Sequence, residues 1–191
     1  PGEADGESGD VVLDLGGAGT ATRFLTAAAV LNAPDAPPIV IDGNARMRQR
    51  PLGTLIELLR ALGARIDELG MAGYPPVRVH PLTSAPETMP TLEIPATASS
   101  QYISALMLTA PFLPAGVALR ATAPHTSPPY IDMTMRLLRR LGVPVEGDAG
   151  VETPIKHHHA GEADPPEEGG ARAAWREPIR VHPARVSCGE G

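Results

Sequence analysis

The chain has 191 residues and a formal net charge of −6, with 42% hydrophobic residues and only 3% aromatic residues. This length supports one substantial core or two small ones, and the scarcity of aromatic residues predicts an aliphatic core. No apolar run approaches the roughly 20 residues that span a bilayer, and no signal peptide is expected. The single cysteine, Cys188, excludes an internal disulfide framework and favours a reducing compartment, the cytoplasm.

The charge is divided unevenly along the chain. Residues 1–10 carry four acids and no base, and residues 147–191 carry eight acids against five bases. Between them, residues 11–146 carry ten acids against eleven arginines, and the arginines are grouped in short motifs. Such groups favour small anionic ligands over nucleic acid, which usually requires a broad basic patch.

Residues 1–10 are polar and acidic, and we expect them to be disordered. An apolar run at residues 11–15 then predicts a strand, which a glycine-rich turn connects to an alanine-rich helix. The further predicted elements follow in order, with the alanine-rich helix at residues 20–32, a strand at 39–42, a helix at 52–62 ended by Gly63, and strands at 64–67 and 77–80.

The same pattern returns in the second half of the chain. Residues 24–31, 39–41 and 58–63 match residues 102–109, 117–119 and 137–142 at shifts of 78 or 79 residues. A fourth match, residues 78–81 with 180–183, is shifted by 102, which indicates an insertion of about 23 residues. The segment at 147–172, rich in proline, glycine and glutamate, is the candidate.

The sequence therefore predicts an α/β fold made of two copies of one βαβαββ unit. We place the first unit at residues 11–95 and the second at residues 96–191, interrupted by the insertion. The alanine-rich helices are apolar on nearly all sides, so we expect them to be buried.

The turn at residues 15–23, Leu-Gly-Gly-Ala-Gly-Thr-Ala-Thr-Arg, is the candidate binding element. Glycines allow close approach of a ligand, a helix start favours an anion, and Arg23 can bind a carboxylate or phosphate through two parallel bonds. Two alternatives remain open. Gly17 and Gly19, followed by a strand ending in Asp42, resemble a dinucleotide-binding fingerprint, and the turn could serve packing alone.

Polar residues recur at the other predicted helix starts. Residues 99–101, Ser-Ser-Gln, offer more donors than a helix cap requires. In residues 46–50, Arg-Met-Arg-Gln-Arg, an extended backbone would put all three arginines on one face, although a solvated basic loop is the alternative. With residues 127–132 in the second copy, four helix starts facing one cleft would bind a ligand with several negative charges.

Lys156 and the three histidines at 157–159 lie within the predicted insertion. Consecutive histidines form a metal site only on a rigid scaffold with further ligands. We therefore expect no metal site there.

Five motifs together resemble the enolpyruvyl transferase family and, within it, the EPSP synthases. They are residues 15–23, 46–53 (Arg-Met-Arg-Gln-Arg-Pro-Leu-Gly), 74–76 (Tyr-Pro-Pro), 99–102 (Ser-Ser-Gln-Tyr) and 129–134 (Pro-Tyr-Ile-Asp-Met-Thr). The resemblance implies an inside-out α/β barrel of βαβαββ units around buried helices, with about two units present. It also implies cofactor-free transfer of the carboxyvinyl group of phosphoenolpyruvate to the 5-hydroxyl of shikimate 3-phosphate, in the shikimate pathway.

The resemblance further implies roles for individual residues. Those expected to bind shikimate 3-phosphate are Arg23, Ser99, Ser100, Gln101, Ser127 and Tyr130. Those expected to bind phosphoenolpyruvate are Gly19, Thr20, Arg50 and again Gln101. Asp42 and Asp132 are acid/base candidates by composition alone, and the motifs assign that role to neither.

Two features depart from the family pattern. Gly17 stands where the family usually has Asn, which predicts weaker binding of phosphoenolpyruvate. The chain is less than half as long as the family's and lacks its N-terminal lysine motif and second domain. We therefore expect the chain alone to be inactive, with a second chain or domain completing the site and with no nucleic-acid or membrane partner. The alternative is a non-catalytic remnant of the family.

Overall fold

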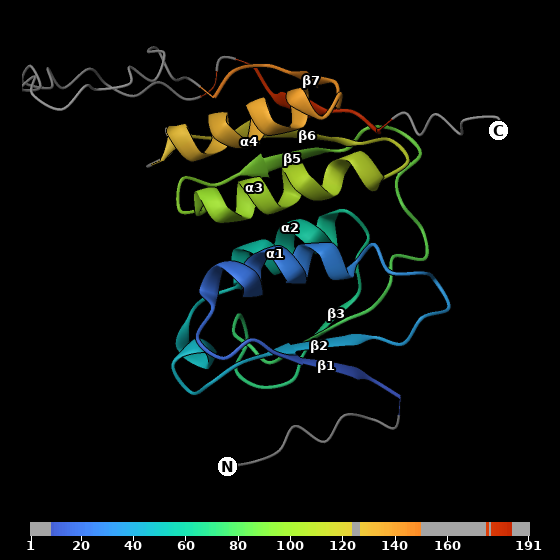
Figure 1. The fold of residues 1–191 in the computed structure, drawn as a ribbon, viewed down its shortest axis with the longest axis vertical. Helices are drawn as coiled ribbons and strands as arrows, with labels where there is room; N and C mark the ends of the chain where they lie inside the picture. Colours follow the sequence, from blue (N-terminus) through green and yellow to red (C-terminus); the bar gives the residue numbers. More distant parts are fainter. Residues whose placement is uncertain (1–8, 124–126, 150–174, 176, 185–191) are drawn as a thin grey trace, which may run out of the picture.

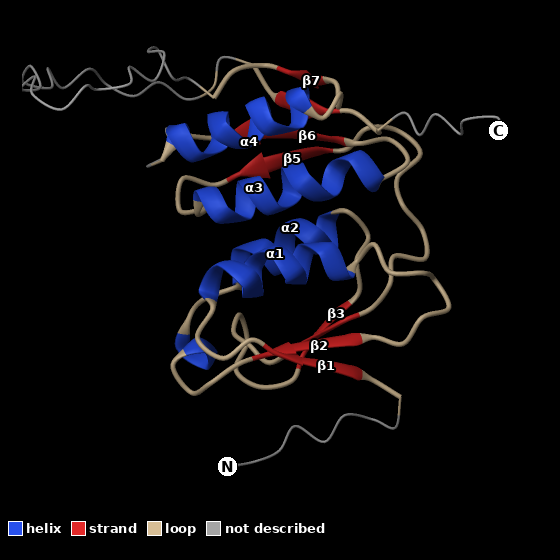
Figure 2. Ribbon diagram, in the orientation of Figure 1, coloured by secondary structure: helices blue, strands red, loops and turns tan. Residues whose placement is uncertain are grey.

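The computed structural model describes residues 9–123, 127–149, 175 and 177–184. They form two similar halves, each with one four-stranded sheet and two α-helices (Figures 1 and 2). The halves meet where α1 packs against α3, and one apolar core runs through both. Within the described ranges, no helix is long and apolar enough to cross a membrane.

The first unit follows the predicted order of strands and helices. Its elements are β1 (Val11–Asp14), α1 (Gly19–Ala29), β2 (Ile39–Asp42), the 3-10 helix η1 (Met47–Gln49), α2 (Gly53–Ala61), β3 (Ile66–Glu68) and β4 (Val77–Val79). The strand order is β1-β2-β4-β3, with β1 parallel to β2 and the other pairs antiparallel. α1 and α2 lie over this sheet (Figure 1).

The second unit repeats this arrangement. Its elements are β5 (Thr91–Ile94), α3 (Ser100–Thr109), η2 (Ala110–Phe112), β6 (Val117–Ala121), α4 (Pro128–Arg140), β7 (Val145–Glu146) and β8 (Ile179–Val181). The strand order, β5-β6-β8-β7, and the parallel and antiparallel pairings match those of the first sheet. The predicted α/β fold with a repeated βαβαββ unit is confirmed.

The boundary between the two sheets lies between β4 and β5. Since β5 pairs with β6, the second sheet begins a few residues before the predicted boundary at residues 95 and 96. The predicted insertion falls between β7 and β8, which pair directly. Most of that insertion, including residues 156–159, lies outside the described residues, as do residues 1–8.

The prediction of disorder for residues 1–10 is wrong for its last residue. The side chain of Asp10 is 5% exposed and accepts a hydrogen bond at 2.8 Å from Arg78 Nε on β4. This pair joins the segment before β1 to β4, which lies on the other side of β2 in the first sheet. A charge this buried requires such a partner.

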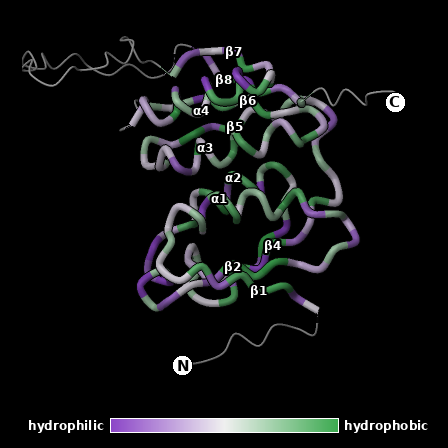
Figure 3. The backbone as a smooth tube through the Cα atoms, in the orientation of Figure 1, coloured by the Kyte–Doolittle hydropathy of each residue, from purple (hydrophilic) through white to green (hydrophobic). Residues whose placement is uncertain are grey.

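Burial agrees with a mainly aliphatic core, to which both the strands and the helices contribute, and the strands of both sheets are largely hydrophobic in Figure 3. α3 is buried along most of its length, as predicted for an alanine-rich helix. α1 is buried on one face only, since Leu25 is 38% exposed and Ala28 is also exposed. The expectation that both alanine-rich helices are buried on all sides is therefore correct for α3 and wrong for α1.

Candidate functional site

The turn between β1 and α1 is built on the end of β2. Gly16 has a φ of +55°, a conformation that glycine adopts without strain. Its N–H donates to Asp14 Oδ1 at 2.8 Å, and its carbonyl accepts the N–H of Asn44 at 3.0 Å. α1 then begins at Gly19, so the unpaired N–H groups of a helix start lie at this turn.

Two arginines converge on Gly19. A methyl group placed on Gly19 would lie 2.5 Å from Arg50 Nη1 and 2.6 Å from Arg23 Nη1. Arg23 Nη1 donates to the Gly19 carbonyl at 2.7 Å, whereas its Nε is buried without a partner. In the described part of the chain, no carboxylate pairs with either guanidinium. Two cations this close repel one another, and a bound anion would relieve that repulsion.

Two side chains of α3 connect this site to the second unit. Gln101 Nε2 donates to Thr20 Oγ1 at 3.1 Å across 81 residues of sequence. The Tyr102 hydroxyl donates to the carbonyl of Pro51 at 2.7 Å, and its ring centroid lies 5.8 Å from the guanidinium carbon of Arg23. Both units therefore contribute to the surroundings of Arg23. Tyr102 lies in the Ser-Ser-Gln-Tyr motif, but nothing in the sequence indicated a role for it.

The predicted serines lie at the starts of the second pair of helices. Ser99 caps α3, with its Oγ accepting the N–H of Gln101 at 3.3 Å, and Ser100 is the first residue of that helix. Ser127 precedes α4 without making a side-chain cap bond, and Tyr130 is 62% exposed on the first turn. All four helices begin on the same side of the molecule, at the left of Figure 1.

The structure does not bring all the predicted site residues into contact. Gly19, Thr20, Arg23, Arg50 and Gln101 form one connected group around the start of α1. Over the described residues, no hydrogen bond links the α4 start to this group. The shared side of the helix starts supports a common site, whereas direct contact is restricted to this first group.

A comparison with models of protein families shows which family the chain belongs to. Residues 2–163 match the family of EPSP synthase (3-phosphoshikimate 1-carboxyvinyltransferase). The chain belongs to the EPSP synthase family. The sequence resemblance is thereby confirmed.

Individual members of the EPSP synthase family give the extent of the match. The 3-phosphoshikimate 1-carboxyvinyltransferase of Enterobacter sp. (strain 638) is 41% identical over 140 residues, which are 73% of this chain and 31% of the relative. The pentafunctional AROM polypeptide of Eremothecium gossypii is 40% identical over 139 residues, 72% of this chain and 9% of that protein.

A solved EPSP synthase from Acinetobacter baumannii has the same fold. It superimposes with a TM-score of 0.55 at 23% identity, over 72% of this chain and 29% of that one. The chain thus spans about a third of the length of the single-function relatives that it matches.

One expectation about the EPSP synthase motif at residues 46–50 is wrong. The backbone at residues 47–49 is a 3-10 helix rather than an extended segment, so alternate residues do not share a face. Met47 is fully buried, and its N–H donates to Asn44 Oδ1 at 3.0 Å. This hydrogen bond stabilises a turn instead of an extended backbone. Arg46 is exposed, Arg48 binds Asp42, and only Arg50 reaches Gly19.

Both acid/base candidates are held in ion pairs. Asp42 accepts two hydrogen bonds from Arg48, at 2.9 Å from Nε and 2.5 Å from Nη2. Asp132 accepts one at 2.8 Å from Arg136, one helical turn later. Each carboxylate is thus paired with a neighbouring arginine.

Gly17 lies beside the carboxamide of Asn44, which no sequence motif indicated. A methyl group on Gly17 would lie 3.3 Å from Asn44 Nδ2. The orientation of that amide is fixed because Oδ1 accepts the N–H of Met47. Asn44 carried no signal in the sequence, since it is 27 residues from Gly17 and lies outside every arginine pattern.

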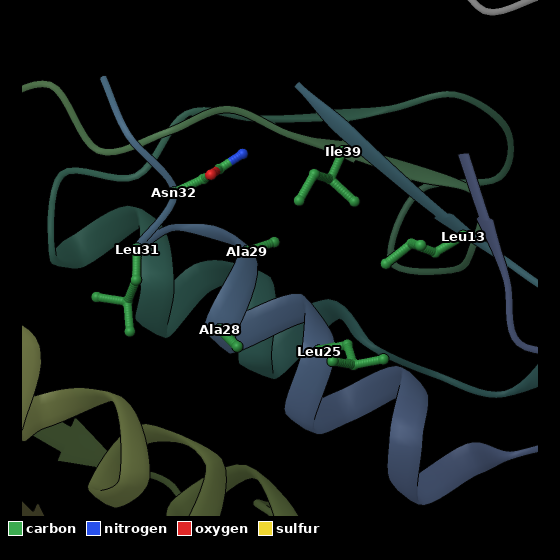
Figure 4. Close-up of a pocket in the computed structure, with 7 residues that line it drawn as sticks. All are labelled: Leu13, Leu25, Ala28, Ala29, Leu31, Asn32 and Ile39. Carbon is green, nitrogen blue, oxygen red and sulfur yellow. The ribbon is translucent and has the colours of Figure 1, made fainter. Parts of the chain in front are cut away.

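A pocket of about 280 Å³ lies elsewhere, between α1 and the strands β1 and β2 (Figure 4). Its lining is apolar apart from Asn32, and consists of Leu13, Leu25, Ala28, Ala29, Leu31, Asn32 and Ile39. None of the predicted site residues lines it. Over the described residues, no group of three or more potential metal ligands is present either.

Proposed function

We propose that this chain supplies part of the substrate-binding site of an EPSP synthase. The reaction is the transfer of the carboxyvinyl group of phosphoenolpyruvate to the 5-hydroxyl of shikimate 3-phosphate, and we place it in the cytoplasm. The observation that carries the proposal is the convergence of Arg23 and Arg50 on Gly19 without a carboxylate partner among the described residues. Substrates that carry phosphate and carboxylate groups match such a pair of cations.

The proposed roles divide the site between the two units. Gly19, Thr20 and Arg50 would frame phosphoenolpyruvate, and Gln101, which already binds Thr20, would contact both substrates. Arg23, Ser99, Ser100, Ser127 and Tyr130 would bind shikimate 3-phosphate. The arrangement supports this division because the helix starts share one side of the molecule and favour anions there.

Catalysis would require groups from outside this chain. Asp42 and Asp132 are both held by arginines, and general acid/base catalysis needs a free group positioned at the reacting proton. We therefore propose that a second chain or domain completes the site. Release of inorganic phosphate from the two substrates by the purified chain alone would contradict this part of the proposal.

Substitutions separate this function from its rivals. Arg23→Gln and Ser100→Ala should each weaken binding of shikimate 3-phosphate by about tenfold or more, because each removes a bond to the phosphate. Arg120→Gln is the control, since Arg120 pairs with Glu93 on the exposed surface of the second sheet. A non-catalytic remnant would show no binding to lose, and a dinucleotide-binding domain would bind NAD in the same titration.

A further inference from the structure

The loop that carries Arg50 is joined to the end of β2 by a bidentate ion pair. Arg48 donates to both oxygens of Asp42, through Nε at 2.9 Å and through Nη2 at 2.5 Å. The Asp42 side chain is only 10% exposed, so its charge depends on this partner. The hydrogen bond from Arg48 and the Asp42 charge together raise the pKa of Arg48 above its usual value.

The neighbours of Arg48 fix the backbone of the same loop. Met47 is fully buried, and its N–H is capped by Asn44. Immediately after Arg48 and Gln49, the chain leaves the 3-10 helix at Arg50 with extended backbone angles, φ −95° and ψ +124°. The direction in which the Arg50 side chain departs is therefore set by the residues at 47 and 48.

Arg50 itself lacks a comparable anchor. Its Nη1 lies beside Gly19, and within the described residues no carboxylate holds it. A free arginine side chain has large rotamer entropy, and the neighbouring guanidinium of Arg23 repels it. Some feature of the loop must therefore keep Arg50 near Gly19.

We propose that the Asp42–Arg48 pair is a positioning device that holds Arg50 at the anion site. This inference rests on the proposed function, in which Arg50 binds phosphoenolpyruvate. Asp42 accepts from Nε and Nη2 of Arg48, so this edge of the guanidinium is held against β2 and supports the loop. The motif at residues 46–50 thus uses one arginine for anchoring and another for binding.

The test follows the Arg50 side chain directly by NMR. In ¹⁵N-labelled chain, the Arg50 Nε–H resonance is assigned by its disappearance in Arg50→Lys. Asp42→Asn should broaden or shift this resonance and weaken phosphoenolpyruvate binding about tenfold. Arg48→Lys, which keeps the charge but loses the planar fork, should have an intermediate effect. Glu93→Gln, which breaks the exposed pair with Arg120, is the matched control.

A double-substitution cycle separates positioning from a purely structural role. If Asp42 acts through Arg50, Asp42→Asn should cost no further affinity in an Arg50→Ala background. An unchanged Arg50 resonance in Asp42→Asn, or an affinity loss that persists without Arg50, would overturn the proposal. If Asp42→Asn fails to fold, the Arg50 resonance and the phosphoenolpyruvate affinity are measured in Arg48→Lys instead. A wild-type chain that binds no phosphoenolpyruvate would count against the proposed function, whereas the Arg50 resonance would still decide the positioning role.

Discussion

At the scale of single residues, the site depends on Gly19, which has no side chain and so leaves room for two arginines. Arg23 and Arg50 approach Gly19 so closely that a methyl group would lie about 2.5 Å from a nitrogen of each. Both obstructing atoms are the ends of flexible side chains, which can move without disturbing the fold. The glycine is therefore required by the ligand site more than by folding.

Gly19→Ala should consequently separate binding from stability. The new methyl group displaces the two guanidiniums, and we expect phosphoenolpyruvate affinity to fall about tenfold or more. The midpoint of thermal unfolding should stay the same or rise, because alanine favours the helix. Calorimetric titration and thermal denaturation of the same sample measure both. Equal losses of affinity and stability would contradict the account.

At the level of elements, α3 and α4 are joined by a buried chain of hydroxyl groups. Ser104 Oγ and Thr134 Oγ1 lie 2.8 Å apart, and Thr134 Oγ1 donates to the carbonyl of Tyr130 at 2.9 Å. Because the Thr134 hydroxyl donates to Tyr130, it accepts the hydrogen bond from Ser104, and the Ser104 hydroxyl thereby has a partner. Both side chains are more than 90% buried.

Thr134→Val should lower the free energy of unfolding by about 1–3 kcal/mol, because it leaves the Ser104 hydroxyl buried and unpaired. Ser104→Ala should cost less, since Thr134 keeps its bond to Tyr130. The double variant should be more stable than Thr134→Val alone. Urea denaturation measures all three, and a double variant less stable than either single variant would refute the explanation.

The segment between β3 and β4 depends on Glu68. This carboxylate accepts hydrogen bonds from the N–H of Gly73 and from Arg60 Nη2, and Gly73 in turn accepts the N–H of Leu52 before α2. The bond from Gly73 lowers the pKa of Glu68 below its usual value. Glu68 thereby links the β3–β4 connection to the start of α2.

Glu68→Gln should make the protein less stable by about 1 kcal/mol at pH 7. Because folding lowers the pKa of Glu68, its stabilisation is complete above the unfolded-state pKa and is lost as the pH falls through the folded-state pKa. The difference from wild type should therefore shrink as the pH falls from about 5 to about 3. Urea denaturation across this range measures it, with exposed Glu57→Gln as control. A difference that grows in acid would contradict the assignment.

Much of the element order follows from the sequence, because apolar periodicity and glycine positions report local structure. Gly63, for example, ends the helix region of α2 with a φ of +95°, as its position after an apolar stripe predicts. β5 was missed because it has only four residues and proline on both sides. η1 was missed because charge alternation at residues 46–50 resembles an extended strand.

The site was less predictable than the elements. The arginines and Gln101 became candidates because of their positions at helix starts, where helix geometry favours anions. Contacts such as Gln101 with Thr20 and Tyr102 with Pro51 join residues 81 and 51 positions apart. No local pattern encodes such contacts, because they depend on how the two units pack.

In the whole molecule, the repeat places equivalent residues in different environments. Leu62 and Leu141 occupy the same position after the second helix of each unit, yet Leu62 is 2% exposed and Leu141 is 69% exposed. Similar exposure of Tyr130, Met133 and Leu137 gives α4 an apolar stripe on its surface. The end of α2 is thus more completely covered than the end of α4.

This difference predicts unequal effects of the same change. Leu62→Ala should lower the free energy of unfolding by about 2–5 kcal/mol because it leaves a cavity in the core. Leu141→Ala should change it by less than about 0.5 kcal/mol. Denaturant unfolding of the two variants compares them directly, and equal losses would show that the stripe on α4 is covered in solution.

The central claim is that both units together form a site for a phosphorylated ligand. Its most direct test is calorimetric titration of shikimate 3-phosphate into the purified chain at low salt, with unphosphorylated shikimate as the control. The account predicts saturable heat with the phosphorylated ligand only. Absence of heat from a chain whose circular dichroism spectrum shows it to be folded would contradict it.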